Sequence, residues 1–124
     1  MPTLTQDVPY AYAAVSPGGT VYAAGACPLD EAGDVVAAGD VPAQAERVMR
    51  NLEEALRATG CGLGDVLKTT VYVASSDRAD LVAAWDVVRA AFGDHDAPST
   101  LLGVAVLGYP EQLVEVEAVA VRRG

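Results

Sequence analysis

The segment at residues 113–121, LVEVEAVAV, constrains the fold more than any other part of the chain. Side chains of a β-strand alternate between two faces, so one face here carries only valine and alanine, and the other carries two glutamates among apolar residues. A strand that is apolar on both sides lies in a sheet that is covered twice. Glu117, in the middle of this strand, must then be hydrogen-bonded, neutral or functional, because an unpaired buried carboxylate is costly.

Length, composition and charge exclude several classes of protein. The 124 residues suffice for a single core, so we expect residues 1–124 to form one domain. A hydrophobic content of 52% gives more apolar surface than such a core can bury, which favours self-association. The net charge of -9, with only eight Lys and Arg, argues against nucleic-acid binding and against an anionic membrane surface.

The sequence also indicates a compartment. The N-terminus has no basic region followed by an apolar block, so we expect no signal peptide. Pro17-Gly18-Gly19 interrupts the uncharged run at 8–29, which favours a hairpin over a membrane span. Cys27 and Cys61 are too few for a disulfide scaffold and lack the spacing of a zinc site. We therefore expect a cytoplasmic protein that needs no metal and no other cofactor.

Hydrophobic periodicity and turn residues predict seven main elements. Asp40 is a good N-cap for the first helix, and Gly60 is its C-terminal stop. Ser76 or Asp77 caps the second helix, which ends at Phe92. In chain order we expect strands at 10–15 and 20–24, a helix at 41–59, a strand at 66–73, a helix at about 78–92, and strands at 100–106 and 113–121.

The order β-β-α-β-α-β-β predicts an α+β fold in which two helices pack on one face of a mixed sheet. The second face of that sheet would stay uncovered in a monomer. The strand at 100–106 nevertheless has apolar side chains on both faces. We therefore expect neighbouring copies of the chain to cover the open face.

Segments spread over nearly the whole chain follow the pattern of one known family. They are Pro9-Tyr10, Gly25, Pro28-Leu29-Asp30, Gln44, Asn51-Leu52, 65–71, Gly103-Val104 and 114–121. In this order they resemble the Rid family, the YjgF-like reactive intermediate deaminases that often carry the label L-PSP endoribonuclease. The resemblance implies a chorismate-mutase-like fold, a homotrimer around a central barrel, and small-molecule ligands in clefts between subunits.

This chain departs from the RidA branch of that family at the ligand cleft. There, a cleft arginine binds the carboxylate of a 2-imino or 2-enamino acid, which water hydrolyses to a 2-oxo acid and ammonia. A guanidinium suits this task because it makes two parallel charge-assisted hydrogen bonds. Counting back from Gly103, the arginine position is Ser99 here; the serine before Gly25 is Ala24, and the asparagine of the second helix is Trp85. The resemblance thus implies a bulkier, less acidic or differently charged ligand.

Two residues that match the family pattern are the first candidates for the site. Glu117 is the candidate catalytic residue, because a carboxylate among apolar neighbours can carry a proton to or from water. Its alternative role is structural, as a glutamate bonded to backbone at a subunit interface. Tyr10 could stack on or hydrogen-bond a ligand, or serve as an interface aromatic.

The other candidates for substrate binding each have an equally simple structural role. Ser99 and Thr100 could donate hydrogen bonds to a ligand, or form a polar pair at the start of a strand. Cys27 could react as a thiolate, or fill a small buried space. Trp85 could line the cleft, or pack on the core side of the second helix.

A ribonuclease mechanism is disfavoured, because His95 is the only histidine and an acid and a base beside cationic phosphate contacts would be needed. We expect a Rid-like enzyme that acts hydrolytically on an imine, an enamine or a related reactive intermediate, with weak or absent 2-iminopropionate deaminase activity. One alternative is a non-catalytic small-molecule binding or chaperone-like trimer. Another is a specialised-pathway enzyme that uses the same cleft for a different reaction.

Overall fold

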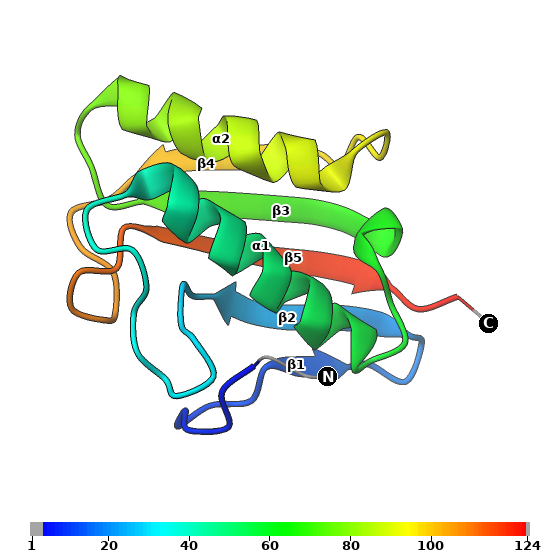
Figure 1. Ribbon diagram of the computed structural model, residues 1–124. Coiled ribbons are helices and arrows are strands. Elements are labelled where there is room, and N and C mark those ends of the chain that lie inside the picture. Colours follow the sequence, from blue (N-terminus) through cyan, green and yellow to red (C-terminus); the bar gives the residue numbers. More distant parts are fainter. Residues whose placement is uncertain (1–3, 124) are drawn as a thin grey trace.

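Five strands form one sheet, and both helices lie on the same side of it (Figure 1). The computed structural model describes residues 4–123. The sheet order is β1-β2-β5-β3-β4; β3 and β4 are parallel, and the other neighbouring pairs are antiparallel. The elements are β1 (Ala13–Val15), β2 (Thr20–Ala26), α1 (Val41–Arg57), the 3-10 helix η1 (Leu63–Asp65), β3 (Val66–Val73), α2 (Arg78–Phe92), β4 (Ser99–Gly103) and β5 (Val114–Val121). The predicted α+β class, with two helices on one face of a mixed sheet, is confirmed.

Each helix begins where the sequence predicts. The Asp40 carboxylate accepts a hydrogen bond from Ala43 N at 3.0 Å, and Asp77 caps α2 through Ala79 N in the same way. α1 packs on β2 and β5, while α2 packs on β3 and β4. The core side of α1 is fully buried at Val48 and Leu52. Burial of each such side chain stabilises the fold by about 1.5–3 kcal/mol.

The central strand β5 has the two faces that its sequence predicts. Every second side chain, from Val114 to Ala120, is buried beneath the helices. Glu115, Glu117 and their apolar neighbours lie on the other face, which no helix covers and where they are half-buried. Apolar groups remain exposed on this open face, since Tyr22 is 56% and Leu102 44% accessible.

Two strands are shorter than the sequence predicts. β4 ends at Gly103 rather than Val106, because its parallel partner β3 ends at Val73 and offers no further ladder. Val106 is consequently 79% exposed, outside any strand. β1 begins at Ala13 rather than Tyr10, because the pairing with β2 stops where β2 becomes irregular after Ala23.

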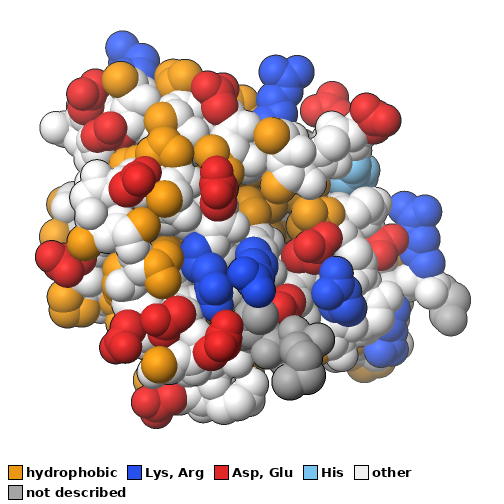
Figure 2. Space-filling model, in the orientation of Figure 1, with side chains coloured by type: hydrophobic (Ala, Val, Ile, Leu, Met, Phe, Trp, Pro, Cys, Tyr) orange, Lys and Arg blue, Asp and Glu red, His pale blue; other side chains and the backbone are white. Residues whose placement is uncertain are grey.

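The helix-covered side has a mixed, mostly polar surface. Figure 2 shows acidic side chains spread over this side, with hydrophobic atoms in small groups between them. In residues 4–123, neither helix is long and apolar enough to cross a membrane. The exposed apolar side chains Tyr22 and Leu102 lie on the opposite, open face of the sheet.

Candidate functional site

Glu115 lies at the centre of a cluster of polar groups at the start of β5. The Cys27 thiol donates a hydrogen bond to Glu115 Oε1 at 3.4 Å, and Gln112 Nε2 donates to the same oxygen at 3.1 Å. Tyr10 lies beside the thiol, and the Tyr109 hydroxyl donates to the Tyr10 hydroxyl at 3.4 Å. We call these five residues the Glu115 cluster. It combines one carboxylate, two phenols, a thiol and an amide.

A bulge in β2 makes room for the Glu115 side chain. Ala23 pairs with Ala118 and Ala26 with Val116, so β2 has one residue more than β5 over this interval. Gly25 lies in the bulge, and a methyl group on it would be 2.6 Å from Cδ of Glu115 and closer still to Oε2. A glycine inside a strand commonly marks such a close approach. The carboxylate thus rests directly on the backbone of Gly25.

Two buried amides of α1 hold the segments that carry the cluster. Gln44 Nε2 donates to Glu111 O at 3.0 Å, and Gln44 Oε1 accepts from Leu113 N at 2.7 Å. Asn51 Nδ2 donates to Cys27 O at 2.9 Å. Because both amides belong to one rigid helix, the loop before β5 and the end of β2 keep a fixed relation to each other.

The surroundings of the cluster keep the Cys27 thiol and the Tyr10 phenol protonated. Burial and the neighbouring Glu115 charge raise the pKa of the Cys27 thiol to about 12. Burial, followed by the hydrogen bond with Tyr109, raises the pKa of Tyr10. The thiol and the phenol are therefore neutral donors at physiological pH, and the thiolate that a nucleophilic cysteine needs is not populated.

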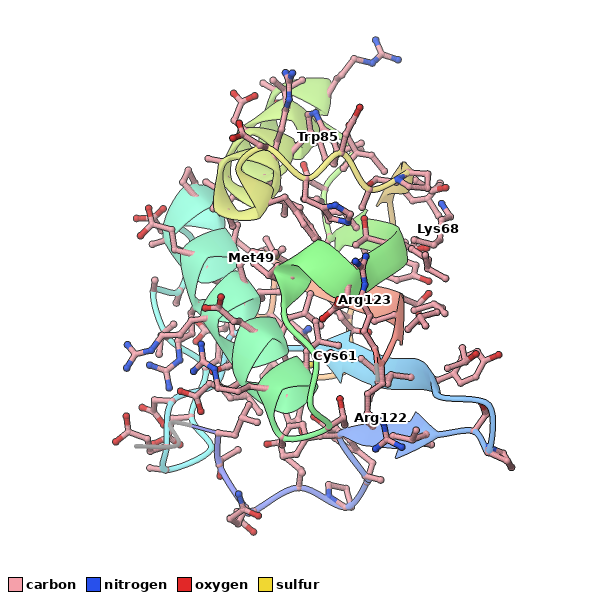
Figure 3. The ribbon with its side chains drawn as sticks, turned by 90° about the vertical axis from the view of Figure 1, so that its right-hand side faces the viewer. Met49, Cys61, Lys68, Trp85, Arg122 and Arg123 are labelled. Carbon is pink, nitrogen blue, oxygen red and sulfur yellow. The ribbon has the colours of Figure 1, made fainter. Side chains whose placement is uncertain are left out.

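Glu117, the predicted catalytic residue, has a different environment. Its Oε1 accepts a hydrogen bond from Tyr72 Oη at 2.5 Å, on the open face of the sheet. This hydrogen bond is the main reason that the pKa of Tyr72 is raised. The nearby Lys68 points away from the two helices (Figure 3) and donates to Thr100 Oγ1 at 2.5 Å. Within one chain Glu117 does not lie near Tyr10. The glutamate in the cluster that contains Tyr10 is Glu115.

The structure places the remaining predicted residues in two groups. Cys27 joins Tyr10 in the Glu115 cluster, whereas Ser99 and Thr100 lie on β4, across β5 and β3 from β2. Ser99 Oγ contacts Thr69 Oγ1 at 2.5 Å and donates to Ala97 O at 3.1 Å. Trp85 lies on α2, half-buried against the core, at the opposite edge of the molecule from β1 (Figures 1 and 3). One chain alone does not unite these residues in a single cleft.

Larger hollows lie elsewhere on the described surface. One of about 620 Å³ borders Leu4, Tyr12 and Thr59, and another of about 590 Å³ lies between the helices at Met49 and Val87. Neither hollow is lined by Glu115 or Glu117. The candidate site is therefore identified from the hydrogen-bonded carboxylates and not from the size of a hollow. Residues 4–123 contain no group of three or more His, Cys, Asp or Glu that is placed to bind a metal ion.

Sequence reasoning singled out Glu117 and missed Glu115, although both lie on the same face of β5. The available signal was Gly25, which directly follows the strand predicted at 20–24 and lies inside the observed β2. An interior glycine indicates a bulge or a close approach, and the residue that approaches is Glu115.

Comparisons with known proteins identify the family. Residues 3–122 match the sequence model of the family described as endoribonuclease L-PSP. The 2-iminobutanoate/2-iminopropanoate deaminase of Salmonella typhimurium is 35% identical over 108 residues, which cover 86% of this chain and 82% of that protein. A putative endoribonuclease L-PSP from Entamoeba histolytica superposes with a TM-score of 0.86 at 30% identity, over 96% of this chain and 93% of that chain. Escherichia coli TdcF with bound serine superposes with a TM-score of 0.81 at 28% identity, over 98% of this chain and 94% of that chain. The chain therefore belongs to the endoribonuclease L-PSP family, the Rid (YjgF-like) family that its sequence resembles.

Proposed function

We propose that this protein hydrolyses a small imine, or the enamine in equilibrium with it, with Glu115 as the group that carries the proton. The observation that supports this most directly is the carboxylate itself, which two donors hold at one oxygen while the other oxygen lies over Gly25. A fixed carboxylate beside neutral donors is suited to general acid and base catalysis. The deaminase name of the 35% identical relative supports the same reaction class.

The reaction needs only water as a second substrate. As the water oxygen bonds to the imine carbon, Glu115 accepts a proton from the water and the C=N double bond becomes a C–N single bond. The carboxylic acid then gives this proton to nitrogen, which leaves an OH and an NH2 group on the same carbon. Glu115 next takes the hydroxyl proton and passes it to the nitrogen, so that the C–N bond breaks, the C=O bond forms, and ammonia and a carbonyl compound leave. The carboxylate is restored to its starting state, so no oxidant or cofactor enters the balance.

Ligand selectivity in the proposal follows from charge. The Glu115 cluster contains no Lys or Arg, and Ser99, the position where the resemblance implies an arginine, offers only a neutral hydroxyl that is already bonded to Thr69. Without a cation, a ligand carboxylate loses a charge-assisted contact of about 1.5–3 kcal/mol, which is one to two decades in affinity. Imines without a carboxylate are therefore the favoured class.

The test is a panel of freshly generated imines, with ammonia release measured against the uncatalysed rate. We expect turnover of at least one imine that lacks a carboxylate, and 2-iminopropanoate hydrolysis about 10 to 100 times slower than by an arginine-bearing relative. RidA-like rates on 2-iminopropanoate would mean that another cation, such as Lys68, takes the role of the arginine. Saturable binding of these compounds without turnover would instead support the non-catalytic alternative.

A homotrimer is part of the proposal for two reasons. The open face of the sheet exposes Tyr22 and Leu102. Within one chain the Glu115 cluster is also far from three predicted ligand-binding residues, which could approach it only from a neighbouring subunit: Ser99, Thr100 and Trp85. Burial of about 800 Å² of apolar area per subunit would contribute on the order of 20 kcal/mol before association costs. Light scattering at micromolar concentration should therefore return three times the 12.7 kDa of one chain. A particle of one chain mass would refute the assembly.

A further inference from the structure

The two oxygens of Glu115 have different environments. Oε1 accepts hydrogen bonds from both Cys27 Sγ and Gln112 Nε2. Oε2 has no hydrogen-bond partner among residues 4–123, and it lies against Gly25. The one fully buried side-chain nitrogen or oxygen without a partner in the described chain is Asn51 Oδ1, so Oε2 of the half-buried Glu115 keeps some contact with solvent. One oxygen is thus held and the other is available.

The amide donor to Oε1 is itself fixed. Gln112 is only 3% exposed, and its Oε1 accepts from Tyr109 N at 3.1 Å. Its Nε2 also donates to Val114 O at 3.1 Å. Both N–H groups of this amide are therefore used, and its oxygen is held by the backbone, which favours a single orientation for the donor to Glu115.

The thiol donor is restrained as well: Glu115 Oε1 is its nearer acceptor at 3.4 Å, and Gly25 O lies 3.5 Å away. The carbonyl of Cys27 is bound by Asn51, and the side chain is 9% exposed. Its proton is retained at neutral pH, because burial and the charge of Glu115 raise the pKa of the thiol to about 12. A neutral thiol of this kind donates a hydrogen bond to the carboxylate and does not attack a ligand.

We infer that Cys27 and Gln112 are positioning residues, which hold Oε1 of Glu115 so that Oε2 alone exchanges the proton with water and the ligand. This inference rests on the proposed hydrolysis, in which Glu115 accepts a proton from the attacking water. A carboxylate free to rotate would present either oxygen in many orientations, and a misplacement of about 1 Å can cost about 100-fold in rate. The cysteine thereby has a role that neither a nucleophile nor an inert core residue would have.

The hydrogen bond between Cys27 and Glu115 can be tested without any substrate. Peptide-resolved alkylation with iodoacetamide at pH 9 should be about tenfold faster in Glu115→Gln than in the wild type, because loss of the charge lowers the pKa of the thiol and each pKa unit changes the thiolate fraction tenfold. Glu117→Gln, two residues along the same strand face, is the matched control and should alkylate Cys27 at the wild-type rate. Equal Cys27 rates in all three proteins would overturn the inference.

The catalytic consequence is tested on the imine that is turned over fastest. Cys27→Ala, which removes the donor, should lower kcat by about tenfold with KM nearly unchanged, while Cys27→Ser, which keeps a donor, should stay within about threefold of wild type. Gln112→Met should lower kcat in the same way. A purely structural cysteine would instead give Ser and Ala variants with equal kcat, and that result would overturn the inference. If no imine is hydrolysed, the proposed function fails, and the alkylation rates still decide whether Cys27 and Glu115 are bonded.

Discussion

Replacement of Gly25 by alanine should displace Glu115 while leaving the fold in place. The added methyl group would lie 2.6 Å from Cδ and 2.8 Å from Cγ of Glu115, well inside van der Waals contact. Gly25 does not have the positive φ that an alanine would resist. The atoms in its way belong to a side chain that can rotate, so the carboxylate moves and the backbone of the bulge stays.

The cost of this displacement follows from the contacts that Glu115 loses. Two hydrogen bonds to a charged acceptor are broken, each worth about 1.5–3 kcal/mol when unreplaced. Because the carboxylate is half-buried, water replaces much of that loss, and a net destabilisation of about 1–3 kcal/mol remains. Alanine recovers about 0.5–1 kcal/mol of the backbone entropy that glycine costs in a strand. The substitution should therefore be mild for stability and severe for activity.

A double-mutant cycle isolates the clash. The free energy of unfolding is measured by denaturant titration, at one protein concentration, for the wild type, Gly25→Ala, Glu115→Ala and the double variant. In the Glu115→Ala background the methyl group meets no carboxylate, so Gly25→Ala should be neutral or stabilising by about 0.5 kcal/mol. The expected coupling energy is thus about 1–3 kcal/mol.

The matched control is Gly62→Ala, whose methyl group would have no neighbour within 4 Å and whose φ is not positive. Its effect should add to that of Glu115→Ala without coupling. If Gly25→Ala destabilises both backgrounds equally, the strain lies in the backbone and Glu115 does not rest on Gly25, which would refute the reasoning about the site.

Two further predictions concern the acidic groups. Glu115→Gln should abolish imine turnover, because an amide cannot carry the proton, whereas Glu117→Gln should retain turnover. Steady-state kinetics that gave the reverse would support the prediction that Glu117 is catalytic. The dependence of the unfolding free energy on alkaline pH tests Cys27. A thiol whose pKa rises from 9.0 to about 12 on folding contributes stability that is fully present below pH 9 and is lost as the pH rises toward 12. Between pH 8 and pH 10.5 the wild type should therefore lose about 2 kcal/mol more unfolding free energy than Cys27→Ser, and parallel losses in denaturant titrations would contradict the raised pKa.

Local signals predict the secondary structure well because they act within a few residues. Asp40 and Asp77 bind the free N–H groups of a helix start, and they mark both helices correctly. The alternation in β5 likewise reports which side chains lie under the helices. The end of β4 could not be predicted in this way, because it depends on where its neighbour β3 stops, and Val73 and Gly103 are far apart in sequence.

The Glu115 cluster was only partly predictable for the same reason. Tyr10 and Cys27 were expected near the cleft, and they do lie together, but Gln112 carries no signal of its own in the sequence. It becomes part of the cluster because Gln44, from the first helix, fixes the turn around Glu111, whose φ is 64°. Contacts of this kind join segments some seventy residues apart, and periodicity does not report them.

The choice between Glu115 and Glu117 shows where strand periodicity stops being informative. Both residues lie on one face of β5, two positions apart, and a regular ladder would give them equivalent neighbours. The extra residue of β2 between Ala23 and Ala26 breaks that equivalence, because it places Gly25 against the side chain of Glu115, although both glutamates keep regular partners on β3. A bulge adds no charge and no ligand of its own, yet it decides which carboxylate has space on one side and donors on the other. The different environments of two identical side chains are thus set by a neighbouring strand, and Gly25 is the residue in the sequence that encodes the difference.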